Sequence, residues 1–322
     1  MKTGRVKAGN GFVQLSKIVL GTAEMGSVLP KDFALKVLDR YFEAGGRTID
    51  TARAYLDFVP FGASQSERTI GEWLRSTGVR DQLTIITKGG CPESRDMNHS
   101  RLERKCIEYD VATSLAVLGL DHVDGYLLHR DDESIPVGEI MDVLDDVVKA
   151  GFTRFIGASN WRVERINEAN AYAVKHGKTP FTISQVFWNM AKVEPGRFHD
   201  DTCVYMNETE YAGYLENKMP VMAYSSQAVG FFSKYLAGEE LKQPRAQNLL
   251  TQVNIARAER CREVCGDLHV SPAALCLAYI ACNQVDGYPI FGSSSMKQFE
   301  ESMQAFDLEI DQKTIDFILE GK

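Results

Sequence analysis

Four residues of this sequence carry side chains that could move or stabilise a proton: Asp50, Tyr55, Lys88 and His129. Free tyrosine has a pKa near ~10, and an ammonium within hydrogen-bond reach favours the phenolate, so we expect Lys88 to lower the pKa of Tyr55. A carboxylate at Asp50 would offset the cost of burying that ammonium and hold it in one rotamer. His129 could donate a hydrogen bond to an oxygen atom of a ligand. Together these residue types predict acid–base chemistry.

The elements that would position these side chains are short apolar, β-branched runs that alternate with amphipathic stretches. Eight such units predict an α/β fold, a closed (β/α)8 TIM barrel forming a single domain over residues 1–322. A short N-terminal β-hairpin is expected to cap the bottom of the barrel. Catalytic groups would then lie on the rim formed by the carboxyl ends of the strands. The predicted strands are Lys17–Gly21, Thr48–Thr51, Leu83–Lys88, Val123–His129, Phe155–Ser159, Thr182–Phe187, Val221–Ser225 and Tyr288–Gly292.

A doubly wound open sheet is the competing fold, because it also alternates strands and helices. That fold places a glycine-rich phosphate turn after its first strand, and residues 21–26, Gly-Thr-Ala-Glu-Met-Gly, match this pattern poorly. Local signals also predict two helix starts. Ser64 and Glu67 have the spacing of a capping box, and Ser271 precedes Pro272 as a cap residue precedes proline in the first turn.

Composition excludes several classes of protein. The 322 residues are 44% hydrophobic and 25% charged, which is typical of a globular protein and excludes disordered and collagen-like chains. The net charge of −8, with Lys and Arg interspersed among Asp and Glu, argues against a nucleic-acid partner. No apolar run approaches the ~18 residues of a membrane helix, and Met1–Phe12 lacks the apolar stretch of a signal peptide. Seven cysteines without zinc-like CxxC pairs are expected to be reduced, so we expect a cytoplasmic protein without a metal site.

Short motifs, in order along nearly the whole chain, resemble those of the aldo-keto reductase family. They are Ile49-Asp50-Thr51-Ala52 with Tyr55, Ser66-Glu67, Ile86-Thr87-Lys88, Leu127-Leu128-His129, Gly157-Ala158-Ser159-Asn160, Gln185, Ala223-Tyr224-Ser225 and the segment from Ile290 to Ser302. The resemblance implies an oxidoreductase that interconverts an aldehyde or ketone and its alcohol with a nicotinamide cofactor. It makes Tyr55 the general acid/base, and Asp50, Lys88 and His129 complete the catalytic set. A small carbonyl or alcohol is then the expected partner.

The same resemblance implies a set of cofactor-binding residues. Ser159, Asn160 and Gln185 would hold the nicotinamide carboxamide and Tyr224 would stack on the ring; alternatively, Tyr224 is a core aromatic and Asn160 a helix cap. Gly230 would permit close approach of the backbone to the pyrophosphate. The full set is Gly21, Thr22, Ser159, Asn160, Gln185, Tyr224, Ser225, Gln227, Gly230, Phe232, Gly292, Ser293, Ser294, Ser295, Gln298, Glu301 and Ser302.

Two departures from the family pattern bear on the cofactor. Most relatives continue Tyr-Ser with Pro-Leu, whereas residues 225–232 read Ser-Ser-Gln-Ala-Val-Gly-Phe-Phe. Lys297 is the cation nearest the predicted eighth strand, and it is out of register with the basic residues that hold the 2′-phosphate of NADP in relatives. The hydroxyls of residues 293–295 can still bind a phosphate. We therefore expect NADP(H), with NAD(H) a close alternative.

The substrate pocket is expected to lie under two long connections, Leu56–Ala63 and Ala228–Leu250, which are candidate lids. Its predicted lining is partly aromatic, although these residues could instead pack against each other: Met25, Phe58, Phe61, Trp161 and Trp188. Such a pocket suits a sugar aldehyde or keto sugar. Two other functions stay open: a Schiff-base aldolase or lyase that uses Lys88 as nucleophile, and a regulatory barrel that binds the cofactor as a redox sensor with little turnover.

Overall fold

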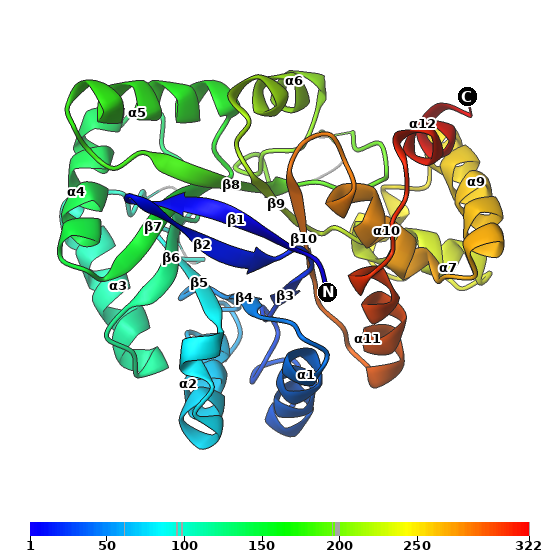
Figure 1. Ribbon diagram of the computed structural model, residues 1–322, viewed down its shortest axis with the longest axis horizontal. Coiled ribbons are helices and arrows are strands. Elements are labelled where there is room, and N and C mark those ends of the chain that lie inside the picture. The colour runs from blue at the N-terminus through cyan, green and yellow to red at the C-terminus, as the bar shows by residue number, and fades with distance from the viewer. Residues whose placement is uncertain (61, 95, 98, 195, 197–199, 322) are drawn as a thin grey trace.

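Eight parallel strands close into a barrel at the centre of the molecule (Figure 1). The computed structural model describes residues 1–322 except 61, 95, 98, 195, 197–199 and 322. Each strand pairs with the next along the chain, and β10 pairs with β3 to close the ring. The strands are β3 (Val19–Gly21), β4 (Thr48–Asp50), β5 (Thr84–Gly89), β6 (Val123–Leu128), β7 (Thr153–Ser159), β8 (Phe181–Phe187), β9 (Val221–Tyr224) and β10 (Gly287–Phe291). All eight predicted strands are confirmed, with bounds that differ by two residues or fewer.

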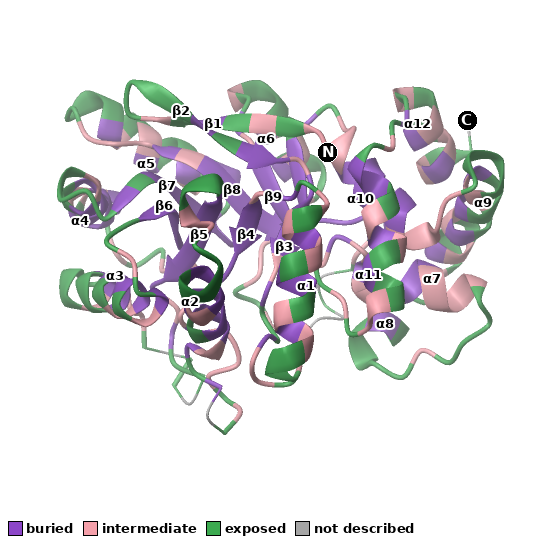
Figure 2. Cartoon of the chain, turned by 60° about the horizontal axis from the view of Figure 1, so that its bottom comes forward, coloured by how far each residue is buried: buried purple, intermediate pink, exposed green. Residues whose placement is uncertain are grey.

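Helices surround the barrel (Figure 2), and most of them bury one face, whereas α10 is buried on all sides from Ala274 to Ile280. In α4, for example, Ile140, Leu144 and Val147 recur at helical spacing and are all buried, which fixes that helix against the sheet. The helices are α1 (Lys31–Glu43), α2 (Gln65–Thr77), α3 (Arg104–Leu118), α4 (Val137–Lys149), α5 (Val163–Lys175), α6 (Glu208–Asn217), α7 (Phe231–Leu236), α8 (Pro244–Gln247), α9 (Gln252–Leu268), α10 (Pro272–Ala281), α11 (Met296–Met303) and α12 (Gln312–Glu320).

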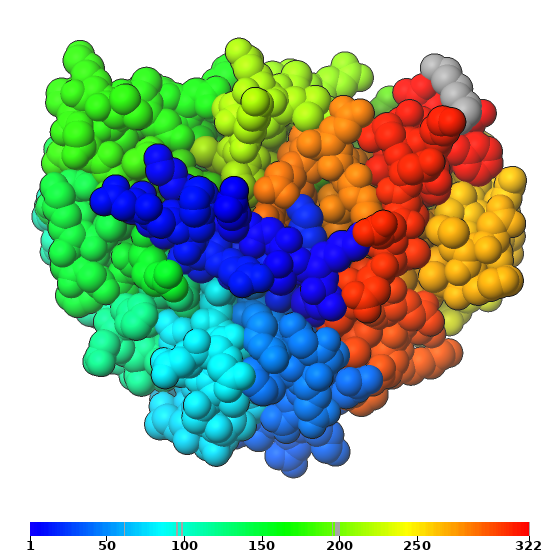
Figure 3. Space-filling model, in the orientation of Figure 1, coloured from blue at the N-terminus to red at the C-terminus, as the bar shows by residue number. Residues whose placement is uncertain are grey.

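A two-stranded antiparallel hairpin, β1 (Thr3–Ala8) and β2 (Gly11–Ser16), lies across the barrel (Figure 3). It contacts the amino ends of the strands: Ser16 N donates to Thr48 Oγ1 at 2.8 Å, and Thr84 Oγ1 donates to Gln14 O at 2.9 Å. The apolar face of the hairpin consists of Val6, Val13 and Leu15. It packs on the side chains that fill the barrel, which are Ile86, Leu127, Phe155, Ile183, Met222, Tyr288 and Ile290. The predicted hairpin at the bottom of the barrel is confirmed, so the opposite rim is the open end.

Both predicted helix starts are confirmed, because α2 begins directly after Ser64 and α10 directly after Ser271. Ser271 caps α10 as expected: its Oγ accepts from Ala274 N, and Pro272 opens the helix. The capping box at α2 is wrong. Ser64 adopts a left-handed conformation with φ of 58° and makes no cap bond, while the buried Glu67 accepts a 2.6 Å hydrogen bond from Thr87 Oγ1. Glu67 therefore faces the barrel and does not reach back to its own helix.

The connections at the open end also differ in part from expectation. The described residues of the predicted lid Leu56–Ala63, 56–60 and 62–63, lie in no helix or strand, but Ala228–Leu250 contains a 3-10 turn at Ala228–Gly230 and the helices α7 and α8. A third long connection, residues 188–207, was not predicted; it pairs with the end of β8, where Phe187 N donates to Val204 O at 2.9 Å. Over the described residues no single helix is long and apolar enough to cross a membrane, although α9 and α10, bent by 95°, pass that test as a pair.

Candidate active site

Asp50, Tyr55 and Lys88 form one hydrogen-bonded cluster on the open rim. Asp50 ends β4 and Lys88 lies near the end of β5, the adjacent strand, so strand pairing brings the two side chains together. Tyr55 Oη donates to Asp50 Oδ2 at 2.8 Å, and Lys88 Nζ donates to the same carboxylate oxygen at 2.7 Å. Lys88 Nζ also donates to Tyr55 Oη at 2.6 Å and to the backbone oxygen of Thr51 at 2.9 Å. All three N–H groups of the ammonium are therefore used.

The pKa of Tyr55 shifts in the direction opposite to the one the sequence suggested. Burial, and then the charge of Asp50 and the hydrogen bond to it, raise the pKa of the Tyr55 phenol well above its ordinary value. The expected lowering by Lys88 is wrong for this state, because Asp50 pairs with the ammonium and accepts the phenol proton at the same time. Tyr55 is thus held as a protonated acid.

His129 follows β6 and faces the Tyr55 ring edge-on, with ring centroids 5.8 Å apart. Burial lowers the pKa of His129 well below its ordinary value, and the positive charges of Arg130, Lys88 and Arg53 act in the same direction. The imidazole is therefore neutral at physiological pH. Its Nδ1 is buried and has no hydrogen-bond partner in the structure. A neutral ring with an unused polar atom beside a phenol is suited to bind an oxygen atom of a ligand.

We expect carbonyl reduction to show no inflection near pH 6.5 that belongs to His129. The reason is that the imidazole carries no charge on either side of that pH. The measurement is kcat/KM from pH 5.5 to 8.5 for the wild type and His129→Gln, which we expect to be slower by about 100-fold with a profile of the same shape. A wild-type step near 6.5 that disappears in His129→Gln would contradict the neutral assignment.

The residues expected at the nicotinamide carboxamide converge on the same rim from β7, β8 and β9. Asn160, with φ of 60°, donates to His129 O at 3.3 Å and to Ser159 Oγ at 3.2 Å, and its Oδ1 accepts from Tyr224 Oη at 2.7 Å. Gln185 Nε2 instead donates to Asp50 Oδ1 at 2.9 Å. The structure thus ties Gln185 to the catalytic carboxylate, a contact that sequence reasoning missed.

The segment after β9 turns sharply where a pyrophosphate was expected. Ser225 and Gly230 have φ of 51° and 76°, so both adopt left-handed backbone conformations. Gln227 Nε2 donates to Ser302 Oγ at 2.8 Å, which links this turn to α11. Phe232 is fully buried and packs edge-on against Phe231, so the residue leaves no exposed surface for a cofactor.

Polar groups also gather where β10 leads into α11. Ser295 Oγ caps the helix by accepting from Gln298 N, and Gln298 Oε1 accepts from Ser294 N at 3.0 Å and Ser294 Oγ at 2.8 Å. Ser293 Oγ is buried without a partner in the structure. Nearby, Gly292 is exposed and Glu301 forms an ion pair with Lys297 at 3.9 Å. At the end of β3, Gly21 pairs with Asp50 of the neighbouring strand β4, and Thr22 Oγ1 donates to Asp50 O at 2.8 Å.

These groups fit a nicotinamide dinucleotide in their chemistry. Two buried polar atoms, His129 Nδ1 and Ser293 Oγ, have no hydrogen-bond partner among the described residues and could each bind a polar group of a ligand. The N-terminus of α11 and the hydroxyls before it could accept a phosphate. Lys297 is a cation on this helix; its side chain is 87% exposed and contacts Glu301 at 3.9 Å.

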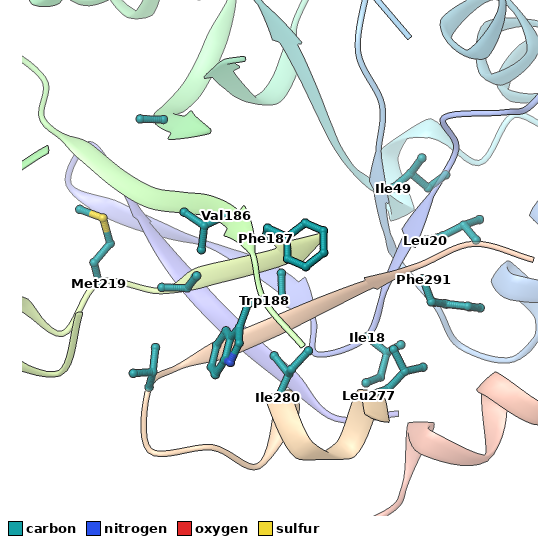
Figure 4. Close-up of a cluster of buried hydrophobic side chains, with 14 of the residues drawn as sticks. Ile18, Leu20, Ile49, Val186, Phe187, Trp188, Met219, Leu277, Ile280 and Phe291 are labelled. Carbon is teal, nitrogen blue, oxygen red and sulfur yellow. The ribbon is translucent and has the colours of Figure 1, made fainter. Parts of the chain in front are cut away.

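The predicted aromatic pocket is wrong in most of its residues. The Trp161 side chain has no exposed surface: it packs edge-on against Phe181 and donates to Arg130 O at 3.1 Å. Met25 and Trp188 are also core residues, and Figure 4 shows Trp188 beside Ile280. Aromatic residues after a strand can thus pack inward. Phe58 alone of this set is exposed, at 67%, and Phe61 lies outside the described residues.

Comparisons with known proteins agree with this geometry. A family model described as the Aldo/keto reductase family matches residues 17–320. The chain is 28% identical to the aldo-keto reductase ausK of Emericella nidulans, over 95% of this chain and 77% of that protein. It is 28% identical to the norsolorinic acid reductase stcV of the same species, over 94% and 77%, and 24% identical to an aryl-alcohol dehydrogenase [NADP(+)] of Phanerodontia chrysosporium, over 95% and 82%.

Proposed function

This chain belongs to the Aldo/keto reductase family of nicotinamide-dependent carbonyl and alcohol oxidoreductases, and from that premise we propose that it reduces an aldehyde or ketone with NADPH at the rim that carries Tyr55. We propose also that residues 1–322 act as a single domain. The observation that supports the site most directly is that Asp50, Tyr55 and Lys88 share hydrogen bonds of 2.6 to 2.8 Å at the open end of the barrel.

Each residue has a distinct task in the proposed reduction. The high pKa of Tyr55 keeps its proton in place, and the O–H can turn from Asp50 toward a carbonyl oxygen while Lys88 keeps its hydrogen bond to Tyr55 Oη. When bound, NADPH would supply hydride to the carbonyl carbon. Once the proton has left, the Lys88 ammonium stabilises the phenolate. Neutral His129 would orient the carbonyl oxygen from the other side of the Tyr55 ring.

NADP(H) is the cofactor that we propose, held by the turn after β9, the N-terminal end of α11 and the Asn160 cluster. One relative is named as an NADP(+) enzyme, which supports this choice. The Ser293 hydroxyl, which has no hydrogen-bond partner among the described residues, and the exposed ammonium of Lys297 could both bind a 2′-phosphate. A preference for NADH in titration would overturn this choice.

The substrate that we propose is an aromatic aldehyde or ketone. This rests on the names of relatives, which include an aryl-alcohol dehydrogenase and a norsolorinic acid reductase. The sugar substrate suggested by the sequence rested partly on an aromatic pocket, and that support is gone because Trp161 and Trp188 are core residues. A Schiff-base role for Lys88 is disfavoured, since the amine is fully buried and all its N–H groups are bonded.

The proposed function is tested by following NADPH oxidation with a panel that contains benzaldehyde, an aliphatic ketone and a keto sugar. We expect a kcat/KM for benzaldehyde at least about tenfold above that for the keto sugar, because a site that accepts an aryl substrate, as the name of one relative states, leaves the hydroxyls of a sugar without hydrogen-bond partners. NADPH and NADH binding, measured by fluorescence, accompany the assay. Cofactor binding without turnover on any carbonyl would support the redox-sensing barrel instead, and a faster keto sugar would restore the sugar substrate.

A further inference from the structure

Arg130 lies immediately after His129, and sequence reasoning assigned it no role. Its side chain is 15% exposed and extends between the end of β6 and the connection of residues 188–207. The guanidinium donates to Thr202 Oγ1 and to His129 O, each at 2.9 Å, and contacts Asp200 Oδ2 at 3.4 Å. Arginine has five N–H groups, so two of them have no acceptor among the described residues.

Arg130 lies next to the catalytic cluster, because its guanidinium donates to the backbone oxygen of His129. Its positive charge lowers the pKa of His129 and opposes the rise in the pKa of Tyr55. Two thiols, Cys91 and Cys203, and the Tyr224 phenol are the other groups that surround it. Burial raises the pKa of both thiols and of the phenol, so these neighbours are neutral at physiological pH and supply no negative charge to the guanidinium.

Asp200 compensates that charge incompletely. Its Oδ1 accepts from both Thr202 N and Thr202 Oγ1, and its Oδ2 accepts from Cys203 Sγ at 3.2 Å while contacting Arg130 at the longer 3.4 Å. Arg165, a structural arginine on α5, contrasts with this arrangement. It donates to the backbone oxygens of Ile135 and Asp132 as well as to Asp131 and Glu168.

A mostly buried guanidinium with unused N–H groups beside a reacting centre is suited to a planar anion, which it can bind with two parallel hydrogen bonds. We propose that Arg130 recognises a carboxylate on the substrate and makes this enzyme selective for carbonyl compounds that carry one. The inference rests on the proposed carbonyl reduction and adds the chemical class of its substrate. It is compatible with an aromatic scaffold, as in a carboxybenzaldehyde.

The test compares 3- and 4-carboxybenzaldehyde with the matching formylbenzamides, which have nearly the same shape but no charge. The measured quantity is the ratio of kcat/KM for acid to amide. We expect Arg130→Gln to lower this ratio by about 10- to 100-fold relative to wild type, mostly through KM, because the contact is present in both the bound and the transition state. Arg130→Lys should give an intermediate ratio, since it keeps the charge without the planar fork.

Two further variants separate recognition from folding and from net charge. Asp200→Asn removes the carboxylate that competes for Arg130 and should raise the acid-to-amide ratio of kcat/KM. Arg162→Gln removes a positive charge from a side chain that is 69% exposed and should leave this ratio within twofold of the wild-type value.

Inhibition provides a second test that needs no variant. Benzoate should inhibit the wild type competitively against benzaldehyde more strongly than benzamide does. Equal ratios in wild type and Arg130→Gln would overturn the proposal, as would equal inhibition by benzoate and benzamide if Arg130→Gln does not fold. If no aldehyde is reduced at all, the proposed function itself fails.

Discussion

Tyr55→Phe should lower kcat for carbonyl reduction by about 1,000-fold and leave NADPH affinity unchanged. The substitution removes the phenol proton that Tyr55 would donate to the carbonyl oxygen, and general acid catalysis raises reaction rates by roughly 100- to 10,000-fold. Steady-state NADPH oxidation and a fluorescence titration of NADPH measure the two effects. The fold should survive, because Asp50 Oδ2 keeps its hydrogen bond from Lys88, and the loss of stability should stay near ~1 kcal/mol.

Tyr211→Phe is the matched control for that prediction. It also removes one phenol hydroxyl, which donates to Asn283 at 2.7 Å, but it does so on α6, where no predicted site residue lies. We expect its kcat to equal that of the wild type. A Tyr55→Phe enzyme that keeps kcat within tenfold of wild type would show that another group supplies the proton.

The placement of the catalytic side chains follows from sequence because strand order and strand ends determine it. The β-branched runs that end at Asp50, Lys88 and His129 become the adjacent strands β4, β5 and β6, so their ends must meet on one rim. The hairpin and the Ser271 cap are equally local signals. Periodicity and spacing therefore predict which residues meet.

Other features depend on three-dimensional contacts that spacing does not encode. The direction of the Tyr55 pKa shift depends on Asp50 accepting the phenol proton while also pairing with Lys88. Trp161 looks like a pocket residue in the sequence, but α5 and β8 bury it completely. Arg130 was overlooked because its environment comes from Asp200 and Thr202, some seventy residues further along the chain.

Variants of the buried ion pair between Lys88 and Asp50 should change the free energy of unfolding and kcat independently of each other. Lys88→Met leaves the Asp50 carboxylate buried without its cation, and breaking such a pair costs about 3–5 kcal/mol of unfolding free energy. The double variant Asp50→Asn/Lys88→Met removes both charges and keeps an acceptor for Gln185 Nε2. We expect it to recover most of the lost stability in urea unfolding.

Activity should not recover with stability in the double variant. Without the ammonium, no cation among the described residues donates a hydrogen bond to Tyr55 Oη to stabilise a phenolate after proton transfer, so kcat should remain at least about 100-fold below wild type in both the single and the double variant. Such a result would assign Lys88 a chemical task distinct from its structural one. If the double variant were as unstable as Lys88→Met, the uncompensated carboxylate could not be the cause of the destabilisation. Recovery of kcat together with stability would instead mean that Lys88 acts only by holding the rim in shape.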